Sequence, residues 1–122
     1  MYKGDLGMYM PKEEMTTYIR ERIRDGNGAV KLLRMFPEEE QPAKCRLFSV
    51  ITLEKGCSIG WHTHDDETEI YYILEGEAET NDNGTVRTLR PGDVTVTGKG
   101  AGHCLENKRD EPMRMLAVVI KD

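Results

Sequence analysis

The chain has 122 residues, of which 38% are hydrophobic and 32% are charged, and its formal net charge is −5. This length gives a single domain large enough for a core. The acidic balance argues against a nucleic-acid surface, which is basic. No apolar run approaches the ~20 residues of a membrane span, and the first ten residues lack the pattern of a secretory signal. We therefore expect one domain, 1–122, that binds neither nucleic acid nor membrane.

The three cysteines are odd in number and form no Cys-x-x-Cys motif. They are Cys45, Cys57 and Cys104. This pattern predicts free thiols and a reducing, cytoplasmic location, because disulfide frameworks use paired cysteines in oxidising compartments.

The segment 11–24 is predicted to be the one helix. Pro11 suits a first helical turn. The apolar side chains recur at the spacing of one helical face: Met15, Tyr18, Ile19 and Ile23. We expect residues 1–28 to form an N-terminal arm with this short helix and residues 29–122 to form a β-barrel.

Beyond residue 28, short apolar runs recur with turn signals between them. The runs predicted as strands are 29–36, 46–53, 69–75, 77–80, 85–89, 94–97 and 113–120. Asn83-Gly84 is a strong signal for a two-residue hairpin turn. Many short strands at this spacing predict an all-β sandwich or barrel.

All three histidines lie in two stretches, residues 56–76 and 92–107. His62 and His64 project to the same face of a strand, because side chains alternate along it. A pair of imidazoles on one face is a candidate for metal binding when further ligands approach it.

Glu69 and His103 are the candidates for those further ligands. If residues 65–68 form a turn, Glu69 opens the neighbouring strand and points back at the same interior. His103 follows the glycine-rich segment 98–102 and begins a third strand. Four ligands from three strands can converge on one ion inside a small barrel.

The two stretches resemble the two sequence motifs of the cupin family. The first has Gly56, His62, His64, Glu69 and Gly76 at the family spacing, and the second has Gly92, Gly98, Gly100, His103 and Asn107. Gly98 stands where the family usually has proline. The resemblance implies a double-stranded β-helix, or jelly-roll barrel, with one divalent metal ion per chain. The implied ligands are His62, His64, Glu69 and His103.

A weaker resemblance links the chain to small stand-alone oxalate decarboxylase-like cupins, through phrases such as EIYYILEG at 69–76. Such proteins are usually dimers that often exchange N-terminal strands. The residues themselves also predict a homodimer, because Ile70, Tyr72 and Leu74 place an apolar face on the outside of a small barrel.

Other side chains near the motifs leave alternatives open. Asp65, Asp66 and Glu67 compete with Glu69 for the carboxylate position, but a turn over these residues leaves them in solvent. Cys104 faces away from the histidines and is better explained as a buried structural thiol.

Tyr71 shares the inward parity of Glu69. It either lines a substrate pocket or packs with its hydroxyl paired, and the sequence does not separate the two. No general acid or base is identifiable.

A set of three imidazoles and one carboxylate favours Mn or Fe and also admits Zn, Ni or Co. The first functional hypothesis is an enzyme that decarboxylates, oxygenates or isomerises a small oxygen-rich carboxylate, such as oxalate or a 2-oxo acid, or a sugar. The second is a module that binds or senses a small ligand without turnover. The third is a storage or structural protein, which the intact ligand set disfavours.

Overall fold

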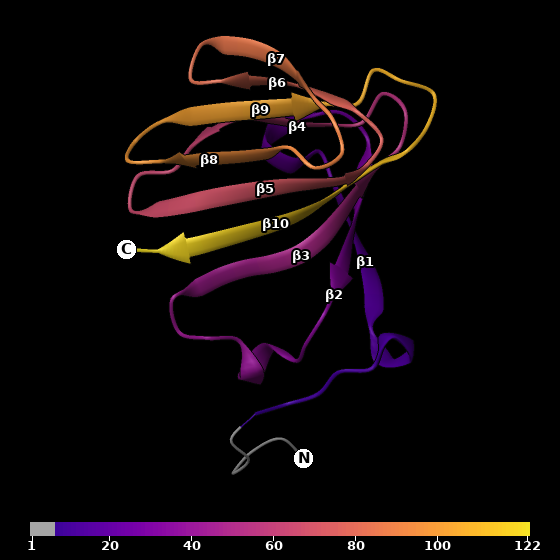
Figure 1. Ribbon diagram of the computed structural model, residues 1–122, viewed down its shortest axis with the longest axis vertical. Helices are drawn as coiled ribbons and strands as arrows, with labels where there is room; N and C mark the ends of the chain where they lie inside the picture. The colour runs from indigo at the N-terminus through magenta and orange to yellow at the C-terminus, as the bar shows by residue number, and fades with distance from the viewer. Residues whose placement is uncertain (1–6) are drawn as a thin grey trace.

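The computed structural model describes residues 7–122, which form ten strands in two facing sheets (Figure 1). The six-stranded sheet has the order β1-β2-β3-β10-β5-β8, and the four-stranded sheet has the order β4-β9-β6-β7. The strands are β1 (Thr16–Glu21), β2 (Ala29–Arg34), β3 (Cys45–Leu53), β4 (Ser58–Thr63), β5 (Glu67–Glu75), β6 (Ala78–Asp82), β7 (Thr85–Leu89), β8 (Val94–Gly98), β9 (Gly102–Glu106) and β10 (Met113–Lys121). Every pairing is antiparallel. The predicted all-β jelly-roll fold is confirmed.

Each of the seven runs predicted as strands overlaps a strand of the structure. The predicted hairpin joins β6 to β7, and its two turn residues, Asn83 and Gly84, have φ values of 50° and 102°. Positive φ at both central residues is the geometry that matches the twist of the flanking strands. The Asn-Gly pair therefore sets the register of this hairpin.

The predicted helix over 11–24 is wrong. Most of this segment is the strand β1, which the 3-10 turn η1 (Lys12–Glu14) precedes and the 3-10 turn η2 (Ile23–Asp25) follows. β1 pairs with β2 along its whole length, and Ile19 on the supposed helical face is 60% exposed. Two adjacent threonines and an isoleucine favour an extended backbone once a partner strand is available. No helix within residues 7–122 is long and apolar enough to cross a membrane.

The interior of the barrel has an apolar half and a polar half. Four side chains of β10 that point inward are fully buried: Met113, Met115, Ala117 and Val119. The polar half holds the buried groups His62, His64, Glu69, Thr80, Thr95, Thr97 and His103. Burial of apolar side chains in one half stabilises the barrel. The other half can therefore hold buried polar groups that form a site.

Asn107 ties the two motifs to the barrel wall. It is fully buried, and its side-chain Nδ2 donates to the carbonyls of Leu53 and Glu111 at 2.9 Å each. The Asn107 side chain therefore bonds the backbone of two other segments of the barrel.

Candidate metal centre

Three strands from both sheets bring together the four groups predicted as ligands. His62 lies on β4 directly opposite His103 of β9, and His64 follows the end of β4. Glu69 comes from β5 of the other sheet. His62 and His64 are 8% and 1% exposed, whereas Trp61, the residue before His62 on β4, is 50% exposed, as strand alternation requires.

The four side chains meet through one atom each. Oε1 of Glu69 lies 2.9 Å from Nε2 of His103, 3.0 Å from Nε2 of His64 and 3.4 Å from Nε2 of His62. Nε2 of His103 lies 3.1 Å from Nε2 of His64 and 3.0 Å from Nε2 of His62. All four ligand atoms fall within 4.8 Å of one another.

This cluster fits one metal ion. Donor atoms that bind an ion at about 2.1 Å and at right angles to each other stand about 3.0 Å apart, close to most of the separations seen here. Imidazole nitrogen and carboxylate oxygen are ligands that first-row divalent metals accept. The donor set and its spacing therefore agree with the predicted four-ligand site.

Hydrogen bonds on the far side of two imidazole rings orient them toward the cluster. Nδ1 of His62 donates to the carbonyl of Gly60 at 2.8 Å, and Nδ1 of His64 donates to Oε2 of Glu67 at 2.6 Å. A ring that donates from Nδ1 keeps the lone pair of Nε2 for a cation. Both lone pairs therefore face the centre of the cluster.

The charges around the cluster favour a cation at its centre. Burial raises the pKa of Glu69, but the three imidazoles that contact it favour the ionised carboxylate and hold this pKa well below its usual range. The contact with Glu69 raises the pKa of His64, although burial opposes the shift. Both shifts show that the buried Glu69 carboxylate attracts positive charge, and a divalent ion would supply that charge.

Glu67 belongs to the site, contrary to the prediction of a solvated turn over residues 65–68. β5 begins at Glu67, whose inward parity matches that of Glu69, and its side chain is only 17% exposed. Arg46 binds both carboxylate oxygens of Glu67 at 2.8 Å. The Arg46 guanidinium, more than the contact with His64, lowers the pKa of Glu67 to about 2. The period-two spacing of the two glutamates was the signal in the sequence.

The remaining alternatives lie outside the cluster. Asp65 and Asp66 are exposed, as predicted. Cys104 is a free thiol that faces away from the cluster, and it is half-buried where full burial was expected. Among residues 7–122, the four predicted groups are the one set of three or more such side chains that could share an ion.

Tyr71 packs against the cluster from the apolar half of the barrel. Its ring stacks on the ring of His103 with centroids 5.0 Å apart and planes 8° apart. This contact orients His103, whose Nδ1 is buried without a hydrogen-bond partner among the described residues. Burial, and then the charge of Glu69, raise the pKa of Tyr71 well above its usual value, so its hydroxyl stays protonated.

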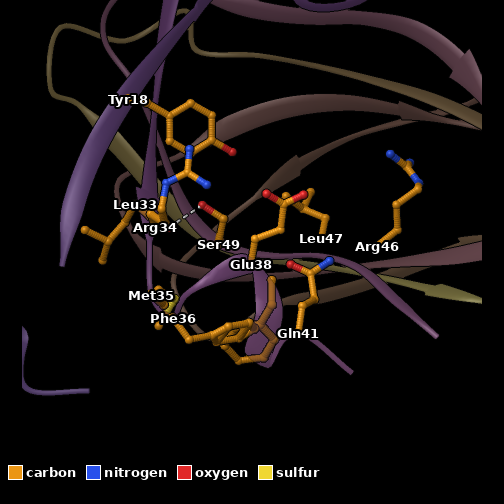
Figure 2. A pocket seen from close by; sticks show the side chains of 11 residues that line it. Tyr18, Leu33, Arg34, Met35, Phe36, Glu38, Gln41, Arg46, Leu47 and Ser49 are labelled. Carbon is orange, nitrogen blue, oxygen red and sulfur yellow. Dashed lines mark hydrogen bonds between the residues drawn. The ribbon is translucent and has the colours of Figure 1, made fainter. Parts of the chain in front are cut away.

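A cavity of ≈ 190 Å³ opens beside the cluster. Its walls include His62, His64, Glu69 and Tyr71, and its rim includes Arg20, Arg24 and Arg46. A second pocket of ≈ 240 Å³ adjoins it and shares Tyr18, Arg46 and Leu47 with it (Figure 2). The second pocket contains none of the four cluster residues, so we place the chemistry in the first.

Gly98, which stands where the family usually has proline, lies at a close approach of two strands. It lies opposite Thr68 in the pairing of β5 with β8, and a Cβ on Gly98 would stand 2.5 Å from Oγ1 of Thr68. A side chain at position 98 would therefore displace the Thr68 side chain, and glycine avoids this contact.

A jelly-roll barrel with three imidazoles and a carboxylate in its interior is the arrangement of a cupin. The chain belongs to the cupin family: the model of the cupin domain matches residues 49–119, more than half of the chain.

Among known proteins, the chain is similar to the oxalate-binding protein of Thermotoga maritima. The two are 37% identical over 118 residues, which are 97% of this chain and 98% of that protein. A crystal structure of a predicted oxalate decarboxylase from the same organism matches with a TM-score of 0.87 and 36% identity, over 94% of this chain and 100% of that one. The cupin domain of Schizosaccharomyces pombe Cnp3 matches with a TM-score of 0.68 over 86% of this chain and 69% of that one; at 17% identity this likeness concerns the fold alone.

Proposed function

We propose that this cupin holds one divalent metal ion through His62, His64, Glu69 and His103 and uses it to bind a small carboxylate of the oxalate or 2-oxo acid class. The observation that carries the proposal is a buried set of four donor atoms beside a cavity of ≈ 190 Å³, which three of the four residues, His62, His64 and Glu69, line. The similarity to an oxalate-binding protein over 97% of the chain supports the ligand class.

We propose Mn or Fe as the metal, with Zn, Ni or Co as the alternatives. Four donor atoms would leave two positions for other ligands on an ion that prefers six, and the cavity that His62, His64 and Glu69 line has room for a small ligand there. When bound, the metal would act as a Lewis acid and as a template for a ligand with two adjacent oxygens. The chain's own residues hold the ion, exclude water from the apolar side and shape the cavity.

A second candidate is turnover of the bound carboxylate by decarboxylation, oxygenation or isomerisation. Tyr71 favours it, because its protonated hydroxyl lies in the cavity wall beside the cluster. The state of Glu67 favours binding alone: this carboxylate is held by Arg46 and by His64, and is not available as a general base.

Calorimetry with oxalate separates these outcomes. We expect the protein loaded with Mn or Fe to bind oxalate and the metal-stripped protein to bind it at least about tenfold more weakly, because the chelating contact is lost. Incubation with oxalate and 2-oxo acids under air and under argon then tests turnover. Equal binding with and without metal would contradict the proposal. Binding of oxalate without any product would support binding alone and exclude turnover of the tested ligands.

We also propose that the protein is a homodimer through the outer face of the six-stranded sheet. Two rows of apolar side chains cross four strands of this face, and the register pairs Phe48, Val118, Ile70 and Val96 in one row and Val50, Leu116, Tyr72 and Val94 in the other. Four of these are large and exposed: Phe48, Tyr72, Val94 and Val96, at 36% to 61%. A continuous apolar face of this kind marks an interface, and a second copy covers it by the simplest symmetry.

Val96→Asp tests this dimer. Val96 is 61% exposed, so the substitution costs little in the monomer, whereas a buried aspartate in each half of the interface should weaken the dimer by on the order of 100-fold or more. Val86→Asp is the matched control, because Val86 is 60% exposed on the other sheet. Sedimentation velocity at micromolar concentration should show dimers for the wild type and Val86→Asp and monomers for Val96→Asp. A monomeric wild type would rule out the interface.

A cytoplasmic location is also proposed. It is supported by the three cysteines, all of which are free.

A further inference from the structure

Two arginines that line the cavity beside the cluster have no acidic partner among residues 7–122. Arg20 on β1 and Arg24 in the 3-10 turn η2 (Ile23–Asp25) both line the cavity that contains Glu69. Arg46, the third arginine of this lining, is held by both oxygens of Glu67. Within residues 7–122, neither Arg20 nor Arg24 forms an ion pair or a side-chain hydrogen bond. Their guanidinium groups are therefore free to bind an anion.

The position of Arg24 is held by an unusual backbone. Arg22, Arg24 and Asp25 have φ values of 51°, 54° and 64°, in the left-handed region that favours glycine. The turn is pressed onto β4, because a Cβ on Gly60 would collide with the carbonyl oxygen of Arg24. Strained residues persist where the surrounding structure enforces them, and they gather at binding sites.

Arg24 and the cluster share one cavity. Its lining includes Arg24 together with His62, Glu69 and Tyr71. Arg34 is different: its guanidinium lies 4.5 Å from the centroid of the Tyr18 ring and lines the neighbouring pocket (Figure 2).

The cavity is a local exception to the charge of the whole protein. The chain carries −5 overall, which repels small anions at a distance. Two arginines of the cavity lining, Arg20 and Arg24, form no ion pair with a described residue, whereas Arg46 is paired with Glu67. The one carboxylate of the lining, Glu69, already contacts the imidazoles. A positive pocket with apolar walls concentrates anions, and the flat fork of a guanidinium matches a carboxylate in shape.

We propose that Arg20 and Arg24 bind the outward-facing oxygens of the carboxylate ligand at the metal centre, and that they select a doubly charged ligand over a singly charged one of the same shape. This inference rests on the proposed function. A ligand that chelates an ion through one oxygen of each carboxylate would have its other oxygens free to meet the cavity lining, which includes Arg20 and Arg24.

The test compares oxalate with oxamate, in which a neutral amide replaces one carboxylate. Calorimetry on Mn-loaded protein should show that Arg24→Gln and Arg20→Gln each weaken oxalate binding by about tenfold and oxamate binding by about threefold or less, because a hydrogen bond to a charged group is the stronger one. Arg22→Gln is the matched control. It removes the same charge from the same strained turn, but Arg22 does not line the cavity. It should change either affinity by less than about twofold.

Metal content and the midpoint of thermal unfolding should be the same in all four proteins, which separates ligand recognition from damage to the site. Equal effects of Arg24→Gln and Arg22→Gln, or equal losses for oxalate and oxamate, would overturn this inference while leaving the proposed function in place. If the metal-loaded wild type binds neither anion, the proposed ligand class is wrong and the arginines lose this role with it.

Discussion

The double variant His62→Ala, His103→Ala should bind its divalent metal at least about 100-fold more weakly than the wild type, because two of four ligands are removed. Elemental analysis after gel filtration should find almost no metal in it. His62 and His103 face each other across β4 and β9, so the double substitution opens one side of the cluster completely. The apolar half of the barrel is untouched, and we expect the far-ultraviolet circular dichroism spectrum to be unchanged.

Asp65→Asn, Asp66→Asn is the control for this experiment. Both aspartates are exposed and stand next to the ligand residues in the sequence, but neither belongs to the cluster. The control should keep its metal. Retention of metal by the double histidine variant would place the ligands elsewhere in the chain.

Glu67→Gln should lower metal affinity by about 10- to 100-fold, the usual effect of losing a partner that orients a ligand. Glu67 accepts from Nδ1 of His64 at 2.6 Å, and the paired Arg46 lowers its pKa to about 2, so the carboxylate is ionised at neutral pH. Glutamine keeps the shape and removes the charge that holds His64 with its Nε2 lone pair toward the ion. Competition with a fluorescent chelator measures the change.

Glu75→Gln is the matched control, because Glu75 is on the same strand, pairs with Arg114 at 3.1 Å and is remote from the cluster. It should leave the metal affinity within about twofold of the wild type. If Glu67→Gln binds metal as the wild type does, Glu67 is an ordinary ion pair and does not orient His64.

Strand parity accounts for the part of the site that could be predicted from the sequence. His62 and His64 are two residues apart, as are Glu69 and Tyr71, and each pair points inward because side chains alternate along a strand. The two motifs then place the third imidazole at His103. Local spacing gave the inward direction of these side chains, and the resemblance to the two cupin motifs implied the four-ligand set.

Contacts between distant segments account for what was missed. Arg46 and Glu67 are 21 residues apart in sequence, and the pair forms only because β3 and β5 both lie beside β10. The spacing of apolar residues in 11–24 fits a helix, but most of this segment forms the strand β1, because it pairs with β2. Arg24 lines the cavity because the chain turns there through three residues with left-handed backbone, and no local sequence pattern predicts this turn.

The most direct test of the central claim is elemental analysis of the wild-type protein, purified without a metal-affinity tag and then dialysed against Mn or Fe under argon. We expect about one ion per chain, because four buried donor atoms converge on one point. A folded protein that holds no ion after this treatment would contradict the assignment of His62, His64, Glu69 and His103 as a metal centre.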